Sequence, residues 1–247
     1  DDTILFLHGL GGSKREFETL IFPYVPDSWR CIAFDFPGFG RSDLSKTKEH
    51  GIPFYTEIVK EFLNTLGIEK IFLYGMSMGG SIALQFGAQY PERVVKIAAQ
   101  GAPIYGKDVL RVYPALFAYE TSLRANRTIA LYSMTQTLAG LKFGVAIRPK
   151  FLLRIFKHVI NIRESEIVGD EVLEIARRDF REAHPWAIAE TVASILDFDI
   201  RKELRSFTIP SLILDGETAY LKPGLDTTKH IISLLPPHLS RTYYVPE

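Results

Sequence analysis

A serine between glycines stands in a stretch of this sequence whose residue types and spacing suggest covalent chemistry. Gly75-Met76-Ser77-Met78-Gly79-Gly80 lies between an apolar run at 71–74 and a helical pattern at 78–90. Glycines that flank a serine permit the strained turn needed to pass directly from a strand into a helix. The hydroxyl would then project where free N–H groups at the helix start favour a developing oxyanion. We predict that Ser77 is a nucleophile; the alternative is a glycine-rich turn with an incidental serine.

Short apolar runs that alternate with helical patterns surround this motif. Nearly continuous apolar runs closed by turn residues are typical of strands buried on both faces of a parallel sheet. We expect strands at 3–8, 30–35, 71–74, 94–99, 211–215 and 240–245, and helices at 14–22, 52–66, 78–90 and 224–235. Ser13, three residues before Glu16, indicates a capping box at the first helix. The alternation predicts an α/β fold, a mostly parallel sheet flanked by helices.

The alternation stops between 105 and 205, where helical patterning takes over. We therefore expect a core of residues 1–104 and 206–247 and an inserted helical cap of residues 105–205. The charges within the cap are divided unevenly, with ten basic and two acidic residues in 107–163 but three basic and ten acidic residues in 164–199. The balance of 29 basic and 29 acidic residues in the whole chain hides this polarity.

Three stretches together carry a resemblance to a known family. His8-Gly9-Leu10-Gly11-Gly12 follows the first strand, Asp35-Phe36-Pro37-Gly38-Phe39-Gly40-Arg41-Ser42 follows the second, and the serine motif follows the third. In this order they resemble the oxyanion loop, the D-x-P-G-x-G-x-S turn and the nucleophile elbow of the α/β-hydrolase fold superfamily, in particular its serine esterases and lipases. The resemblance covers essentially the whole chain, because that family also carries a helical cap in this position.

The resemblance implies roles for individual residues. Ser77 would be the catalytic nucleophile, and the N–H groups of Leu10 and Met78 would form the oxyanion hole. The motif residues His8, Gly9, Gly75 and Gly79 would be structural, and Asp35 would hold its turn through backbone hydrogen bonds. A serine at position 77 argues against the dehalogenases and epoxide hydrolases of this fold, whose nucleophile is a carboxylate.

The two partners that a serine nucleophile needs are harder to place. In the family the acid follows the strand here expected at 211–215, yet Ala219 occupies that position, with Asp215 and Glu217 out of register. The base is expected after the strand at 240–245, where the sequence stops at Glu247. Surface or packing roles are expected for the remaining histidines, with His184 of the cap as an alternative base. These histidines fall in loops, in the cap or before the last strand: His50, His158, His184, His230 and His238. We interpret the chain as truncated at both ends, with the base histidine missing; a non-catalytic relative is the alternative.

The expected reaction is cleavage of a carboxylic ester or related acyl bond through an acyl-enzyme at Ser77. Two alternatives stay open: a C–C bond hydrolase or cofactor-free haloperoxidase, and a non-catalytic relative that binds a hydrophobic small molecule. We expect a small hydrophobic substrate, no metal or cofactor, and no nucleic acid, since the net charge is zero. The lone Cys31 and the lack of a 20-residue apolar run fit a cytoplasmic location.

A basic stripe in the cap suggests a further contact. Lys150, Arg154, Lys157 and Asn161 recur at helical spacing among apolar residues. The plainer interpretation is a cap helix that covers the core, with its charges in solvent or paired to the acidic half. The other is contact with an anionic membrane surface.

Overall fold

The computed structural model describes residues 2–46, 48–147, 170–216 and 222–245. Within these residues six strands form one parallel sheet in the order β2-β1-β3-β4-β5-β6. The strands are β1 (Asp2–Leu7), β2 (Trp29–Ala33), β3 (Ile71–Met76), β4 (Val94–Gln100), β5 (Ser211–Gly216) and β6 (Ser240–Val245). The predicted α/β fold class is confirmed, and the sheet is parallel throughout.

Successive side chains of a strand point to opposite faces of the sheet, so apolar strands have two apolar faces to bury. Helices cover both of these faces. Leu5 and Leu7 of β1 join the main core with α2 (Ile52–Thr65), α3 (Met78–Gln89), α10 (Arg201–Arg205) and α11 (Lys222–Leu234). Phe6 points the other way and meets Phe17 of α1 (Arg15–Leu20), with ring centroids 5.4 Å apart. The two faces thus have separate apolar layers, and α1 covers the second.

The start of α1 differs from the expected capping box. The helix begins at Arg15, and the Ser13 hydroxyl accepts from the Arg15 N–H at 3.3 Å instead of from Glu16. The Glu16 side chain does not turn back to close the box, because it is packed beneath Gly12 of the preceding loop. A short 3-10 turn, Phe22–Tyr24, follows the helix.

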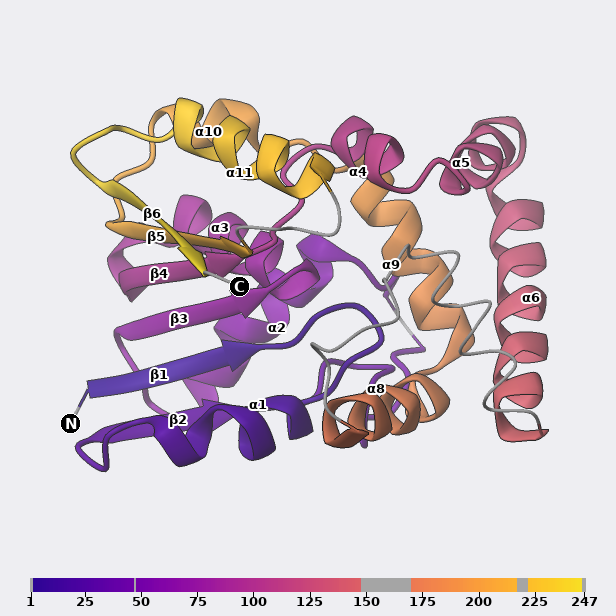
Figure 1. Cartoon of the computed structure of the whole chain (residues 1–247), viewed down its shortest axis with the longest axis horizontal. Coiled ribbons are helices and arrows are strands. Elements are labelled where there is room, and N and C mark those ends of the chain that lie inside the picture. The colour runs from indigo at the N-terminus through magenta and orange to yellow at the C-terminus, as the bar shows by residue number, and fades with distance from the viewer. Residues whose placement is uncertain (1, 47, 148–169, 217–221, 246–247) are drawn as a thin grey trace.

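The inserted helices lie beyond the carboxyl ends of the strands (Figure 1). They are α4 (Gly106–Val112), α5 (Leu116–Ala125), α6 (Arg127–Ile147), α8 (Asp170–Glu182) and α9 (Pro185–Asp197). Helix α9 joins the two parts, since Ile188 and Ile195 pack into the main core while Ala189 and Ala193 pack against Leu131 of α6. The cap is therefore a packed layer anchored by α9.

The segments by which the chain enters and leaves the cap lie side by side. Tyr105 and Asp199 form an antiparallel bridge, flanked by the hydrogen bonds Gly106 N–H to Phe198 O (2.9 Å) and Ile200 N–H to Ile104 O (3.1 Å). A Cβ at Gly106 would lie 1.9 Å from the Leu196 carbonyl oxygen, so only glycine fits there. Helix α10 follows this bridge and packs against α3 and α11.

Two expectations from the sequence concern contact with membranes. The basic stripe of Lys150, Arg154, Lys157 and Asn161 lies outside the described residues. Among the helices that the structure does describe, none combines the length and the apolar character required to span a bilayer.

Candidate active site

Ser77 occupies the sharp turn between β3 and α3. Its backbone has φ 51° and ψ −117°, and among the described non-glycine residues it alone has a positive φ. The Ser77 N–H donates to the Gln100 carbonyl of neighbouring β4 at 2.7 Å, which fixes the turn to the sheet. The side chain is exposed, and its Oγ has no hydrogen-bond partner within the described part of the chain. The hydroxyl is therefore available to a ligand at the carboxyl edge of the sheet.

Close backbone contacts explain the glycines of this turn. A Cβ at Gly75 would lie 2.2 Å from the Gly79 carbonyl oxygen, and a Cβ at Gly79 would lie 2.0 Å from the Leu7 carbonyl oxygen. Both distances are far below any van der Waals contact. The first turn of α3 thus rests directly on the end of β1, which carries the next loop of the site.

The loop after β1 lies against Ser77. A Cβ at Gly9 would lie 3.5 Å from the Ser77 Cβ, and the Gly12 N–H closes the loop by donating to the Gly9 carbonyl at 3.1 Å. The Leu10 N–H has no acceptor among the described residues, and Met78, the first residue of α3, has no intrahelical acceptor for its N–H. The loop that contacts Ser77 and the first turn of α3 therefore each carry a main-chain N–H without an acceptor among the described residues, and an oxyanion hole needs donors of this kind.

His8 is fully buried, and backbone groups occupy both of its ring nitrogens. Nδ1 donates to the Gly9 carbonyl at 2.8 Å, and Nε2 accepts from the Phe36 N–H at 3.0 Å. Burial lowers the pKa of His8 to about 4, so the imidazole is neutral at ordinary pH. The ring joins the loop after β1 to the loop after β2.

Asp35 connects the same two loops through its carboxylate. Oδ1 accepts from the Lys14 N–H at 2.8 Å, and Oδ2 accepts from the Arg41 N–H at 2.9 Å. The Ser42 hydroxyl donates to the Asp35 carbonyl at 2.6 Å. The carboxylate therefore holds the 35–42 turn against the start of α1.

Two histidines elsewhere in the described chain have carboxylate partners. His50 is buried and bonds through Nδ1 to Glu190 of α9 at 2.6 Å, while its Nε2 accepts from the Ser45 N–H. His230 of α11 bonds through Nδ1 to Asp108 of α4 at 3.1 Å. Neither histidine is hydrogen-bonded to Ser77.

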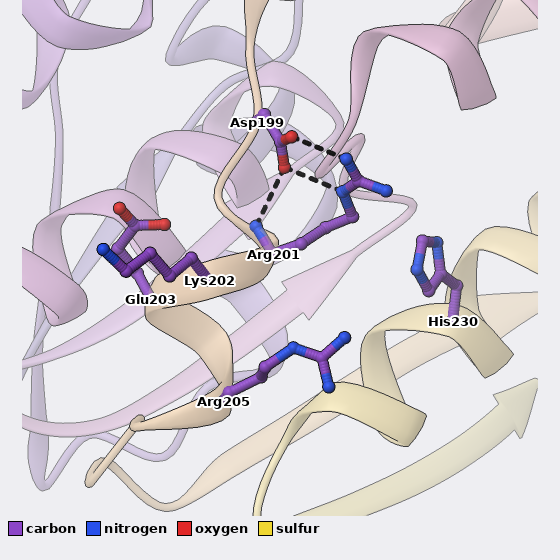
Figure 2. Close-up of a pocket in the computed structure, with 6 residues that line it drawn as sticks. All are labelled: Asp199, Arg201, Lys202, Glu203, Arg205 and His230. Carbon is purple, nitrogen blue, oxygen red and sulfur yellow. Dashed lines mark hydrogen bonds and ion pairs between the residues drawn. The ribbon is translucent and has the colours of Figure 1, made fainter.

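His230 faces a surface depression between α10 and α11. Figure 2 shows the Arg201 and Arg205 side chains extending from α10 into this region, and Arg201 pairs with Asp199 through both carboxylate oxygens. The depression has a volume of about 450 Å³, and Ser77 is not among its lining residues.

The other residues that the sequence analysis considered as partners of Ser77 fall in three places. His184 caps α9, where its Nδ1 accepts from the Trp186 N–H at 3.2 Å. His238 is exposed just before β6, and the parallel sheet puts that position at the edge opposite Ser77. His158, Glu217 and Ala219 lie outside the described residues, as does the Asp215 side chain.

One carboxyl group beside the site was not singled out as functional from the sequence. Glu16 lies in the first turn of α1, and its side-chain oxygens pack against Gly12 of the loop that carries Leu10. Its position three residues after Ser13 was the only signal, and that pattern indicated a helix cap. The packing depends on the path of the loop, which no local pattern encodes.

This protein combines a parallel sheet with a serine on a sharp strand-to-helix turn and an adjacent loop. Together these features are typical of one class of fold, that of the hydrolases. A family model described as alpha/beta hydrolase fold matches residues 2–217. The chain therefore belongs to the alpha/beta hydrolase fold family, which confirms the resemblance of its three motifs.

Curated relatives and solved structures agree with this membership. The chain is 34% identical over 157 residues to a 2-hydroxy-6-oxo-6-phenylhexa-2,4-dienoate hydrolase of Comamonas testosteroni, covering 58% of this chain and 54% of that protein. It is 38% identical over 98 residues to a serine hydrolase-like protein of Danio rerio, covering 38% and 29%. The chain thus spans about half or less of the length of these curated relatives.

The solved structures match the fold at low identity. MenH from S. aureus has a TM-score of 0.70 at 17% identity, covering 99% of this chain and 85% of that chain. An esterase from Exiguobacterium antarcticum has a TM-score of 0.68 at 18% identity, covering 99% and 83%. These matches show a shared architecture.

Proposed function

We propose that this protein is a serine hydrolase that cleaves a carboxylic ester or related acyl bond through an acyl-enzyme at Ser77. The observation that carries the proposal is the exposed Ser77 hydroxyl on a positive-φ turn, next to a loop and a helix start in which the N–H groups of Leu10 and Met78 have no acceptor among the described residues. This arrangement supplies a nucleophile and two donors for the negative charge that develops when a carbonyl is attacked.

The proposed reaction has two steps. Ser77 Oγ attacks the carbonyl carbon while its proton passes to a base, and the carbonyl oxygen becomes an oxyanion held by the two N–H groups. The bond to the leaving group then breaks, the leaving group takes the proton, and water releases the acyl group from Ser77. By the family resemblance, we expect the base to follow β6.

A second candidate reaction is hydrolysis of a C–C bond. The 34% identity to a 2-hydroxy-6-oxo-6-phenylhexa-2,4-dienoate hydrolase favours it. A serine with the same oxyanion hole can serve either bond, because in both reactions a carbonyl carbon is attacked. The identity of the substrate therefore depends on the cap and not on the elbow.

Labelling with a fluorophosphonate probe tests the proposed nucleophile. We expect the intact protein to be labelled and Ser77→Ala to lose labelling completely, whereas Ser133→Ala, at an exposed position of α6, should label like wild type. Aryl esters compared with vinylogous diketones then separate ester cleavage from C–C cleavage. A folded wild-type protein that takes up no probe and turns over neither substrate would favour a non-catalytic relative that binds a hydrophobic small molecule.

A further inference from the structure

A buried carboxyl oxygen without a partner lies beside the proposed oxyanion hole. Among the described residues, Glu16 Oε1 is the one buried side-chain nitrogen or oxygen atom for which no hydrogen bond is found. Buried polar atoms in folded proteins are almost always hydrogen-bonded, so an exception of this kind calls for an explanation. Its position next to Leu10 suggests one.

The Glu16 carboxyl packs against the turn that carries the Leu10 N–H. A Cβ at Gly12 would lie 3.3 Å from Oε1 and 3.4 Å from Oε2, and the same Cβ would lie 3.4 Å from the Gly9 carbonyl oxygen. The 9–12 turn therefore contacts this carboxyl group at Gly12 and Ser77 at Gly9.

The cation that precedes Glu16 in the chain is engaged by other acids. Arg15 binds Asp179 through Nη1 and Glu182 through Nη2, the latter at 3.1 Å, and both acids belong to cap helix α8. The Asp179 side chain is 1% exposed, so its charge acts on Glu16 without much screening by water. Among the described residues no cation is found paired with Glu16.

These surroundings favour the neutral form of Glu16. Burial, followed by the charge of Asp179, raises the pKa of Glu16 to about 8, and a hydrogen bond with the Gly9 backbone lowers it in part. The other groups around it are Arg15, Glu182 and Tyr74 of β3; burial raises the pKa of Tyr74 to about 12, so its hydroxyl stays neutral. The Glu16 carboxyl is therefore the group here that changes charge near neutral pH.

We propose that Glu16 is a positioning residue for the oxyanion hole: its neutral carboxyl supports the Gly9–Gly12 turn, and its ionisation displaces that turn. When charged, the carboxylate keeps a hydrogen bond with the Gly9 backbone but leaves Oε1 without a partner among the described residues, so ionisation should draw in water or move the group. It also places a negative charge close to the developing oxyanion. The effect on turnover rests on the proposed function, whereas the movement of the loop does not.

The kinetic test compares Glu16→Gln with wild type. We expect the wild-type kcat to fall about tenfold between pH 7 and pH 9.5 as the loop loses its geometry, less than the loss of a whole oxyanion donor. Glu16→Gln should keep a similar kcat at pH 7 and lose this alkaline decline, with KM unchanged in both. The matched control is Glu18→Gln on the same helix, an exposed residue paired with Lys14, which should behave like wild type.

A second measurement does not require turnover. The amide resonances of Gly9 and Gly12 in the intact protein should titrate together near pH 8 in wild type and in Glu18→Gln, and should not do so in Glu16→Gln. Titrating resonances in a protein that the fluorophosphonate does not label would refute the proposed function and retain this inference. Resonances that are flat across this range in wild type, or that titrate equally in Glu16→Gln, would overturn it.

Discussion

Ser77 is held in a backbone conformation that a side chain disfavours. A residue with φ 51° and ψ −117° is strained unless it is glycine, by on the order of 1 to 3 kcal/mol. The hydrogen bond from its N–H to Gln100 and the close packing of Gly75 and Gly79 keep it there. Strain at this residue is the cost of presenting a hydroxyl clear of both the strand and the helix.

The strain at Ser77 can be measured by substitution. Ser77→Gly should have a higher free energy of unfolding than Ser77→Ala by about 1 kcal/mol, because glycine relieves the strain of the positive φ. The gain is only partial, since glycine also has more conformational entropy in the unfolded chain. Urea unfolding of the two variants gives the difference. Equal stabilities would show that the turn is not strained in solution.

His8 should make folding sensitive to acid. Its pKa is about 4 in the folded protein against 6.5 for a free side chain, so the unfolded chain binds an extra proton between these values. The stability that neutral His8 provides is present above pH 6.5 and is lost as the pH falls toward 4, by on the order of 3 kcal/mol in total. Glu16 acts in the opposite direction, since its raised pKa makes stability fall as the pH rises from 4.5 toward 8.

Comparison of wild type with His8→Gln over pH 4.5 to 7.5 separates the two contributions. The difference in unfolding free energy between them should shrink as the pH falls, because only wild type loses the His8 contribution. A difference that is constant across this range would mean that His8 does not titrate with a lowered pKa.

At the scale of elements, Arg15 of α1 connects the core to cap helix α8 through its ion pairs with Asp179 and Glu182. Removing Arg15 leaves Asp179 buried without its cation, and Arg15→Met should lower the unfolding free energy by about 2 to 3 kcal/mol. The lower end is expected because the Arg15 side chain is 19% exposed. Arg15→Met combined with Asp179→Leu should recover much of this loss, since no buried charge is then unpaired.

An exposed pair on the same helix provides the control. Lys14 and Glu18 lie 3.2 Å apart with side chains 39% and 47% exposed, so removing either should change the unfolding free energy by less than about 1 kcal/mol. Denaturant unfolding of the single and double variants measures both pairs. Additive losses at Arg15 and Asp179 would contradict the coupling between α1 and α8.

At the scale of the whole molecule, the sheet and the serine turn could be predicted from local patterns. Most of the strands are apolar runs closed by a turn residue, and the glycines around Ser77 mark a sharp strand-to-helix turn. Contacts between distant segments could not be predicted in this way: Arg15 and Asp179 are 164 residues apart, and the burial of Glu16 depends on where the loop after β1 folds. The predicted capping box was wrong for the same reason. The Glu16 side chain packs against Gly12 instead of forming a local hydrogen bond with Ser13.

The bridge between Tyr105 and Asp199 brings the two ends of the inserted helices side by side. A module whose ends meet in this way can be exchanged for another of different length without shifting the register of any strand. If the proposed function holds, chimaeras that are joined at these two residues should inherit the proposed nucleophile Ser77 from one parent and the inserted helices from the other. The same property gives natural selection a means to diversify specificity while the chemistry stays fixed.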